Sequence, residues 1–303
     1  MNQQSIPSLD FPRVTMGALT APPTLDFVLP GLLAGTVGMI CGTGAVGKSF
    51  LALHIAQAIA CGVPVAGGLW PAPARGRVLV IAGEDPVQIL ENRLWLLKQT
   101  MSPIEIEAFD DLADIRTGAG FDLRLLTKTN SGLVRGPFFE GLLAHAAGYR
   151  LALLDPLAFL HDADEIDNGA MTMLMIVCQE ICRITGCTII LLHHFSKAGA
   201  SEDGDNWAAA RGASSLTTAV RWQVNLTPPR KKDKEDYKID PDLAGFWIRV
   251  AQVKANYAPP TAARWLHKLP GGLLRFEEMF KVSSGWSGAK KEVKGVPPND
   301  ADF

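Results

Sequence analysis

Short apolar runs alternate with longer stretches in which apolar residues recur every three or four positions, from about residue 36 to residue 192. The short runs are typical of buried strands, and the longer stretches are typical of amphipathic helices. Strands are predicted over residues 36–41, 77–82, 150–154 and 187–192, and helices over residues 48–60, 86–100, 137–147 and 170–185. Residues 112–126 show only a weak pattern. Strands and helices that alternate in this way predict a mainly parallel sheet flanked by helices.

The pattern changes after about residue 217, where three further strands are predicted over residues 217–226, 246–253 and 264–269. Turn residues separate them, so they predict an antiparallel extension of the same sheet. Residues 230–236 carry mixed charges and are predicted to form a solvated hairpin tip. The predicted fold is therefore α/β, with a mainly parallel sheet, flanking helices and an antiparallel strand extension.

No break in composition divides the 303 residues into two domains. A Pro-rich arm is expected over residues 1–24, a single domain over 25–282, and a flexible tail over 283–303. Residues 27–47 carry no charge and could span a bilayer by length. Six of them are glycines and the run ends in a glycine-rich motif, so a strand and a loop are the better interpretation.

Composition narrows the functional classes further. Lys and Arg number 29 against 31 Asp and Glu, for a net charge of −2, so any contact with nucleic acid must be local. An odd number of cysteines, five, without an export signal indicates a reducing compartment, and a cytoplasmic location without membrane contact is expected. The cysteine spacings favour buried thiols over a metal site.

A glycine-rich motif, Gly-x4-Gly-Lys-Ser, directly follows the first predicted strand and precedes a predicted helix. Glycines in such a loop let backbone N–H groups face phosphate oxygens, and the helix N-terminus favours the same negative charge. Lys48 can reach the β- and γ-phosphates, and the Ser49 hydroxyl can ligate Mg²⁺. Binding of ATP with Mg²⁺ is therefore predicted, at Gly42, Thr43, Gly44, Ala45, Val46, Gly47, Lys48, Ser49 and Phe50.

Two other predicted strands end in carboxylates. Asp155 ends an apolar strand and can hold Mg²⁺ at the nucleotide crevice, although it could simply begin a turn at Asp155-Pro156. Glu84 and Asp85 follow the strand over residues 77–82. If the two strands are neighbours, Glu84 can polarise the attacking water as a catalytic base, and Asp85 can cap the helix that begins at Pro86. The plainer interpretation gives both residues a capping role.

His193 and His194 end a third strand. A histidine there can sense the γ-phosphate and pass its state to the loop that follows, although a single histidine is more often structural. The sequence leaves open which of the two is the sensor. The loop over residues 196–210 is rich in Gly, Ala, Asp and Ser and leads to Arg211.

The order of these motifs resembles the RecA-like ATPases, and among them the RepA-type hexameric replicative helicases of broad-host-range plasmids. The resemblance runs from about Pro22 to Pro297. Its specific pieces are Ala34-Gly35-Thr36-Val37-Gly38, Glu84-Asp85-Pro86, His193-His194-x-Ser196-Lys197, Arg211-Gly212-x-Ser214-Ser215, Arg221-Trp222 and Lys254-Ala255-Asn256-Tyr257.

The resemblance implies an ATP-dependent DNA helicase of plasmid replication that forms a hexameric ring, with ATP bound between neighbouring subunits. Arg211 then matches the arginine finger, which reaches the neighbour's γ-phosphate, and Lys254 matches a second basic residue at that interface. Without the resemblance, Arg211 would be interpreted as part of an ordinary surface ion pair. Single-stranded DNA would thread the channel, and a replication initiator or a primase would be a partner.

The loops that would face the DNA are acidic, and they keep an alternative open. Asp162, Asp164, Glu165 and Asp167 lie in the first loop, and Glu202, Asp203 and Asp205 lie in the second. Carboxylates repel phosphate, so DNA affinity would depend on a few residues such as Lys197. The alternative is an ATP-switched assembly or recombination mediator that binds DNA or protein without unwinding. A small-molecule phosphotransferase is disfavoured, because loop 196–210 has one basic residue where a closing lid needs several.

Overall fold

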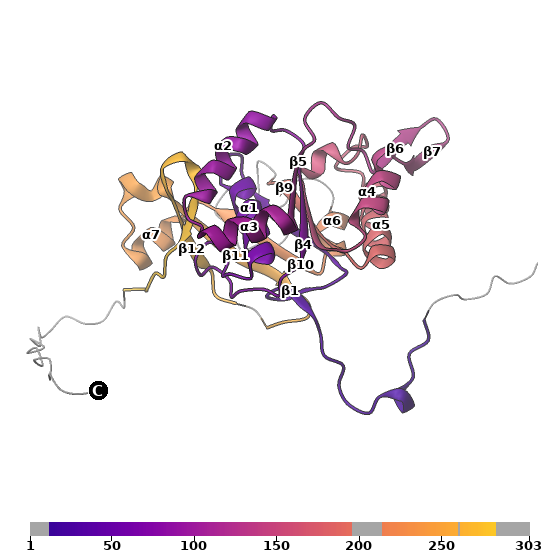
Figure 1. Ribbon diagram of the computed structural model, residues 1–303, viewed down its shortest axis with the longest axis horizontal. Helices are drawn as coiled ribbons and strands as arrows, with labels where there is room; N and C mark the ends of the chain where they lie inside the picture. Colours follow the sequence, from indigo (N-terminus) through magenta and orange to yellow (C-terminus); the bar gives the residue numbers. More distant parts are fainter. Residues whose placement is uncertain (1–11, 196–213, 260, 283–303) are drawn as a thin grey trace, which may run out of the picture.

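A nine-stranded sheet forms the centre of the protein in the computed structural model, which describes residues 12–195, 214–259 and 261–282. Figure 1 shows helices on both of its faces. The strand order is β13 (Leu274–Phe276), β12 (Arg264–Lys268), β11 (Trp247–Ala255), β10 (Trp222–Thr227), β3 (Val37–Gly42), β9 (Thr188–His194), β8 (Tyr149–Asp155), β4 (Arg77–Ala82) and β5 (Ala113–Thr117). The helices are α1 (Lys48–Cys61), α2 (Val87–Lys98), α3 (Pro103–Leu112), α4 (Phe138–Ala146), α5 (Asn168–Thr185), α6 (Ser214–Ala219) and α7 (Lys231–Tyr237).

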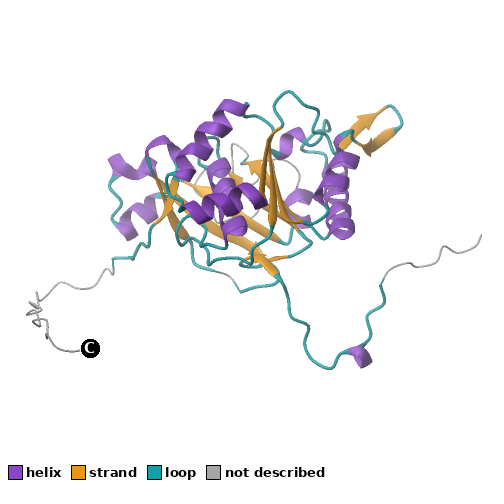
Figure 2. Ribbon diagram, in the orientation of Figure 1, coloured by secondary structure: helices purple, strands orange, loops and turns teal. Residues whose placement is uncertain are grey.

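The parallel part of the sheet runs from β10 through β3, β9, β8 and β4 to β5. Its strands are apolar throughout because both faces are covered. On one face, Ile40 and Leu153 pack with α1, α2 and α3; on the other, Met39 and Leu154 pack with α4 and α5. Figure 2 shows these two helical layers. The α/β fold predicted from the alternating pattern is confirmed.

The antiparallel extension is confirmed for β11, β12 and β13, which are added beyond β10. The first strand predicted for it, β10, instead pairs in parallel with β3 and only its other edge is antiparallel, to β11. One boundary is wrong, because residues 217–219 belong to α6 and the strand begins only at Trp222. Thr217 and Thr218 have the β-branched side chains of a strand, but α6 packs against α5 and this tertiary contact outweighs the local preference.

The charged segment 230–236 was predicted to be a solvated hairpin tip, and this is wrong. It forms helix α7, in which Asp233 is only 4% exposed. The Asp233 carboxylate accepts hydrogen bonds from the Arg230 guanidinium and lies 3.6 Å from the Arg249 guanidinium on β11. The Asp233 carboxylate is therefore buried beside two arginines, which a run of charges does not reveal, while the two lysines that begin α7 are exposed.

Several elements lie where the sequence pattern predicted nothing. Helix α3 begins with a capping box between Ser102 and Glu105, and β5 lies within the weak region 112–126. Strands β6 (Leu126–Thr129) and β7 (Gly132–Arg135) form a hairpin that projects beyond the body in Figure 1. Strands β1 (Phe27–Leu29) and β2 (Leu32–Leu33) pair before β3. Short or half-polar strands of this kind give too little alternation to be predicted.

Residues 12–26, before β1, extend away from the body in Figure 1 and include a 3₁₀ turn (Met16–Ala18). Four of the five cysteines are buried, as the sequence suggested, and Cys61 is half-buried. Within the described ranges, no helix combines the length and apolarity needed to cross a bilayer. The domain boundaries and the cytoplasmic location stay predictions.

Candidate nucleotide-binding site

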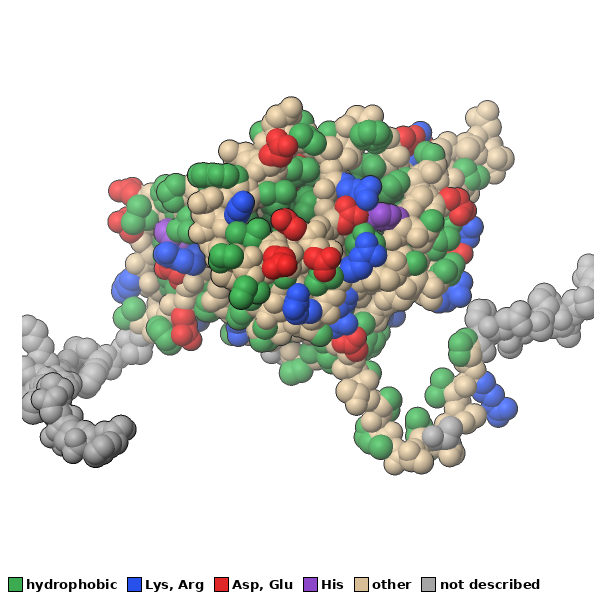
Figure 3. All heavy atoms as spheres, in the orientation of Figure 1, with side chains coloured by type: hydrophobic (Ala, Val, Ile, Leu, Met, Phe, Trp, Pro, Cys, Tyr) green, Lys and Arg blue, Asp and Glu red, His purple; other side chains and the backbone are tan. Residues whose placement is uncertain are grey.

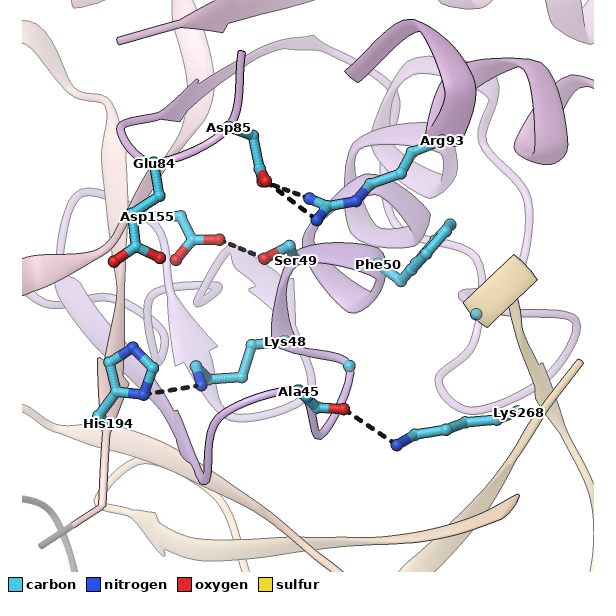
Figure 4. A pocket seen from close by; sticks show the side chains of 12 residues that line it. Ala45, Lys48, Ser49, Phe50, Glu84, Asp85, Arg93, Asp155, His194 and Lys268 are labelled. Carbon is cyan, nitrogen blue, oxygen red and sulfur yellow. Dashed lines mark hydrogen bonds and ion pairs between the residues drawn. The ribbon is translucent and has the colours of Figure 1, made fainter. Parts of the chain in front are cut away.

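The carboxyl ends of β3, β4, β8 and β9 meet at one edge of the sheet, because these strands are parallel and adjacent. A pocket of about 320 Å³ opens there, within the range of small-molecule sites. Figure 4 shows its interior. The residues that line it are Ala45, Gly47, Lys48, Ser49, Phe50, Glu84, Asp85, Arg93, Asp155, His194, Lys268 and Gly272.

The loop between β3 and α1 has the conformation that its glycines permit. Gly47 has φ of 110°, in the left-handed region that side chains avoid. A Cβ atom on Gly42 would lie 2.7 Å from the Val46 side chain and 2.9 Å from the Leu226 carbonyl oxygen. The loop therefore closes tightly over the end of β3, and the N-terminus of α1 opens into the pocket.

Lys48 lies at the base of this loop and is 6% exposed. Its Nζ donates to the carbonyl oxygens of Gly42 at 3.1 Å and Thr43 at 2.9 Å. It also lies 3.4 Å from His194 Nδ1, and since an ammonium group has only protons to give, Nδ1 must be the acceptor. Burial lowers the pKa of Lys48, and the carboxylate of Asp155 acts in the opposite direction. An anion in the pocket would offset this burial cost.

The side chains of Ser49 and Asp155 are in direct contact at the wall of the pocket. The Ser49 hydroxyl donates to Asp155 Oδ2 at 2.6 Å. Burial raises the pKa of Asp155, while the hydrogen bond from Ser49 lowers it. This pair fits Mg²⁺, which prefers oxygen ligands and commonly takes one or two protein groups together with substrate phosphates. Over the described ranges, no cluster of three or more His, Cys, Asp or Glu side chains offers an all-protein metal cage.

Glu84 lines the same pocket from the end of β4. The predicted role of Glu84 as a catalytic base required β4 and β8 to be neighbours in the sheet. The two strands are adjacent, with Ala82 opposite Asp155. The N–H of Gly83 donates to the carbonyl oxygen of Asp155 at 2.6 Å and joins the two strand ends. Both carboxylates therefore face the space above Lys48 and Ser49 (Figure 4).

Asp85 does not cap the following helix, so that prediction is wrong. Helix α2 begins at Val87 with Pro86 before it and no side-chain cap. The Asp85 carboxylate instead forms an ion pair with the Arg93 guanidinium on the same helix, in which Nη2 donates to Oδ1 at 3.1 Å. A charge-assisted, two-pronged contact with an arginine is stronger than a cap to a backbone N–H.

Two basic residues of the pocket were not predicted from the sequence. The Arg93 guanidinium lies 5.7 Å from the centre of the Phe50 ring and so joins α2 to α1. Lys268, the last residue of β12, donates from Nζ to the carbonyl oxygen of Ala45 at 3.0 Å. Arg93 lies within the stretch of helical periodicity over residues 86–100, so the sequence predicted its helix but not its place in the pocket. Lys268 has no local signal, because only the strand order brings β12 to the loop.

Other predicted site residues lie elsewhere. His193 is 1% exposed on β9 and is not among the pocket-lining residues. Successive side chains on a strand face opposite ways, so only His194 reaches the pocket. Lys254 lies level with Met39, about 10 Å along the strand direction from Gly42, because β11 runs against β10 and β3. Arg211 lies outside the described residues.

Carboxylates of the first acidic loop have local partners within the chain. Asp162 accepts from the Arg124 guanidinium at 2.7 Å and from the Lys128 N–H at 2.7 Å. Asp167 caps α5 by accepting from the N–H groups of the two residues after Asn168. These charges are partly compensated within the chain. The acidic residues of the second loop, and Lys197, lie outside the described residues.

A phosphate loop with a buried lysine, beside carboxylates on adjacent parallel strands, is the site of a P-loop ATPase. Residues 6–200 match the model of the AAA domain family, and the chain belongs to that family. The fold is similar to the crystal structure of the RadB recombinase, with a TM-score of 0.51 and 12% identity over 81% of this chain and 92% of that chain. It is also similar to the solved ATPase domain of a second protein, with a TM-score of 0.50 and 12% identity over 80% of this chain and 85% of that chain. At this identity the two structures show a shared fold.

Proposed function

We propose that the protein is a ring-forming ATPase that couples ATP hydrolysis to movement along single-stranded DNA and unwinds DNA during replication, as in plasmids. The observation that carries the proposal is the meeting of Lys48, Ser49, Glu84, Asp155 and His194 in one pocket at the carboxyl edge of the sheet. The motif order that resembles hexameric helicases supports the DNA-directed part. The similarity in fold to a protein named a recombinase is consistent with it.

Within the pocket each residue has a distinct task. Lys48 and the loop N–H groups bind the β- and γ-phosphates, and Ser49 with Asp155 would hold Mg²⁺, which neutralises phosphate charge when bound. Glu84 accepts a proton from the attacking water. Arg211 of a neighbouring subunit would stabilise the charge of the transition state, with Lys254 at the same interface.

His194 is assigned the sensing role because of its contact with Lys48. A phosphate that draws the Lys48 ammonium away removes this donor from His194 Nδ1. The His194 ring then loses this hydrogen bond. His194 lies two residues before the loop over residues 196–210. The state of the nucleotide can reach that loop through this hydrogen bond.

The second candidate is an ATP-switched assembly or recombination mediator that does not unwind DNA. The acidic residues of the first loop favour it, since even paired carboxylates add no affinity for phosphate. On the face shown in Figure 3, acidic and basic side chains are interspersed without a broad basic surface. A strand-displacement assay separates the two candidates.

The test is ATP turnover by the purified protein, with and without single-stranded DNA, at low and moderate salt. Strong stimulation of turnover by DNA supports the helicase. Turnover that does not change when DNA is added, at either salt concentration, favours the mediator. Lys48→Ala should lower turnover by about 100-fold or more, because it removes the ammonium group that faces the phosphates. Turnover that survives in Lys48→Ala would contradict the assignment of the site.

A further inference from the structure

Lys268 brings a second lysine of the same chain to the phosphate loop. It ends β12, 223 residues from its partner Ala45, whose carbonyl oxygen accepts from Nζ at 3.0 Å. Figure 4 shows this side chain reaching the loop from the side opposite to His194, with Lys48 between them. Ala45 has φ of 57°, a left-handed conformation that is unusual for a residue with a side chain.

The segment that follows Lys268 is packed tightly against the nucleotide site. Its turn is closed by hydrogen bonds from the Leu269 N–H to Leu273 and from the Gly272 N–H to Leu269. A Cβ atom on Gly271 would lie 2.7 Å from the Leu96 side chain on α2, and one on Gly272 would lie 2.9 Å from the Phe50 ring on α1. The backbone that carries Lys268 is therefore held in place by packing against α1 and α2.

The charge of Lys268 is not matched by a carboxylate. Among the basic residues of the pocket, Arg93 is paired with Asp85, and Lys48 is attracted by Asp155. No ion pair joins Lys268 to any carboxylate in the described ranges, and its hydrogen bond goes to a neutral carbonyl. Burial lowers the pKa of Lys268, so its ammonium group is held in a place where an anion would stabilise it.

We propose that Lys268 is a second phosphate-binding lysine of the nucleotide site, which exchanges the Ala45 carbonyl for phosphate oxygens when a nucleoside triphosphate binds. This inference rests on the proposed function, since it concerns the ligand of the same pocket. The ammonium group adds affinity in proportion to phosphate charge, so it favours ATP over ADP. It also links the antiparallel extension to the nucleotide state.

The test is equilibrium binding of MgATP and MgADP to the full-length protein, with Lys268→Gln as the decisive variant. Glutamine can still donate to the Ala45 carbonyl but carries no charge, so it separates support of the loop from binding of phosphate. We expect Lys268→Gln to weaken MgATP binding by about tenfold, to weaken MgADP binding less, and to reduce the salt dependence of binding. Lys268→Met should do the same.

Lys281→Met is the matched control, because Lys281 is 62% exposed and pairs with Asp236 away from the pocket. It should bind both nucleotides as the unmodified protein does. If Lys268→Gln keeps full affinity for MgATP while the unmodified protein binds it, Lys268 only supports the loop and the inference is wrong. If the unmodified protein binds neither nucleotide, the proposed function fails and the inference fails with it.

Discussion

The parallel part of the sheet and its antiparallel extension deliver functional residues in different ways. In the parallel part, β3, β4, β8 and β9 all end at the same edge, so residues that follow each strand meet in one pocket. In the extension, successive strands end at opposite edges. Lys254 at the end of β11 lies far from the phosphate loop, whereas Lys268 at the end of β12 touches it.

This difference shows that strand direction, and not membership of a sequence motif, decides whether a lysine reaches the pocket. Lys254 belongs to a recognisable motif, yet its Nζ donates to the carbonyl oxygens of Thr217 at 2.8 Å and Thr218 at 3.0 Å, at the end of α6. Lys268 belongs to no motif and lies in the pocket. Within one subunit, the position of a strand end relative to the sheet edge decides which of the two lysines lies in the pocket.

A large effect, comparable with that of Lys48→Ala, is expected in the parallel part from Glu84→Gln. The variant keeps the shape of the side chain but cannot accept the proton of the attacking water, so ATP turnover should fall about 100-fold while ATP binding is retained. Single-turnover hydrolysis and nucleotide binding, measured on the same preparation, check both parts.

Asp85→Asn is the comparison for that variant. Asp85 lies in the same pocket but is paired with Arg93, so its substitution should change nucleotide affinity more than the hydrolysis step. If Asp85→Asn lowered the hydrolysis step as much as Glu84→Gln, the assignment of the base to Glu84 would be wrong.

His54 joins the two parts of the molecule, and its substitution should give an effect of intermediate size. On α1, His54 Nε2 accepts from the Leu274 N–H of β13 at 3.3 Å. Burial lowers the pKa of His54 to about 4. The folded state therefore keeps the ring neutral, and stability is lost as the pH falls from about 6.5, the ordinary pKa, towards 4.

By this linkage His54 should account for about 2 kcal/mol of the stability lost between neutral pH and about pH 5. His54→Gln should remove that part of the loss, and chemical denaturation at a series of pH values measures it. An unchanged pH profile in His54→Gln would contradict the burial argument.

The smallest effect on nucleotide binding is expected for Lys254→Met. Its ammonium group contacts the end of α6 and not the pocket, so a single subunit should bind MgATP within about twofold of the unmodified protein. Turnover that falls only under conditions of assembly would support the interface role. A tenfold loss of MgATP affinity at protein concentrations too low for assembly would contradict the placement of Lys254.

The pattern of apolar residues predicted β3, β4, β8 and β9 and the helices α1, α2, α4 and α5, because these strands are apolar throughout and these helices show a clear period. It missed α3 and the parallel strand β5, whose residues are mostly exposed or half-buried. The phosphate loop and the carboxylates that follow strands were likewise visible as local motifs. Asp85 and Asp233 show the limit: the sequence suggested a cap and a solvated charge, and both are ion-paired with arginines. A carboxylate's partner depends on which side chain the fold brings near, and spacing alone does not contain that information.

The sequence by itself determined the class of site, since a glycine-rich loop between strand and helix binds phosphate through its own backbone and needs little from elsewhere. The tertiary structure decided which histidine faces the pocket, because the alternation along β9 buries His193 and exposes His194 to Lys48. It also decided that Lys268 reaches Ala45 across 223 residues. Both outcomes depend on strand order and direction, which long-range packing sets and no local pattern records.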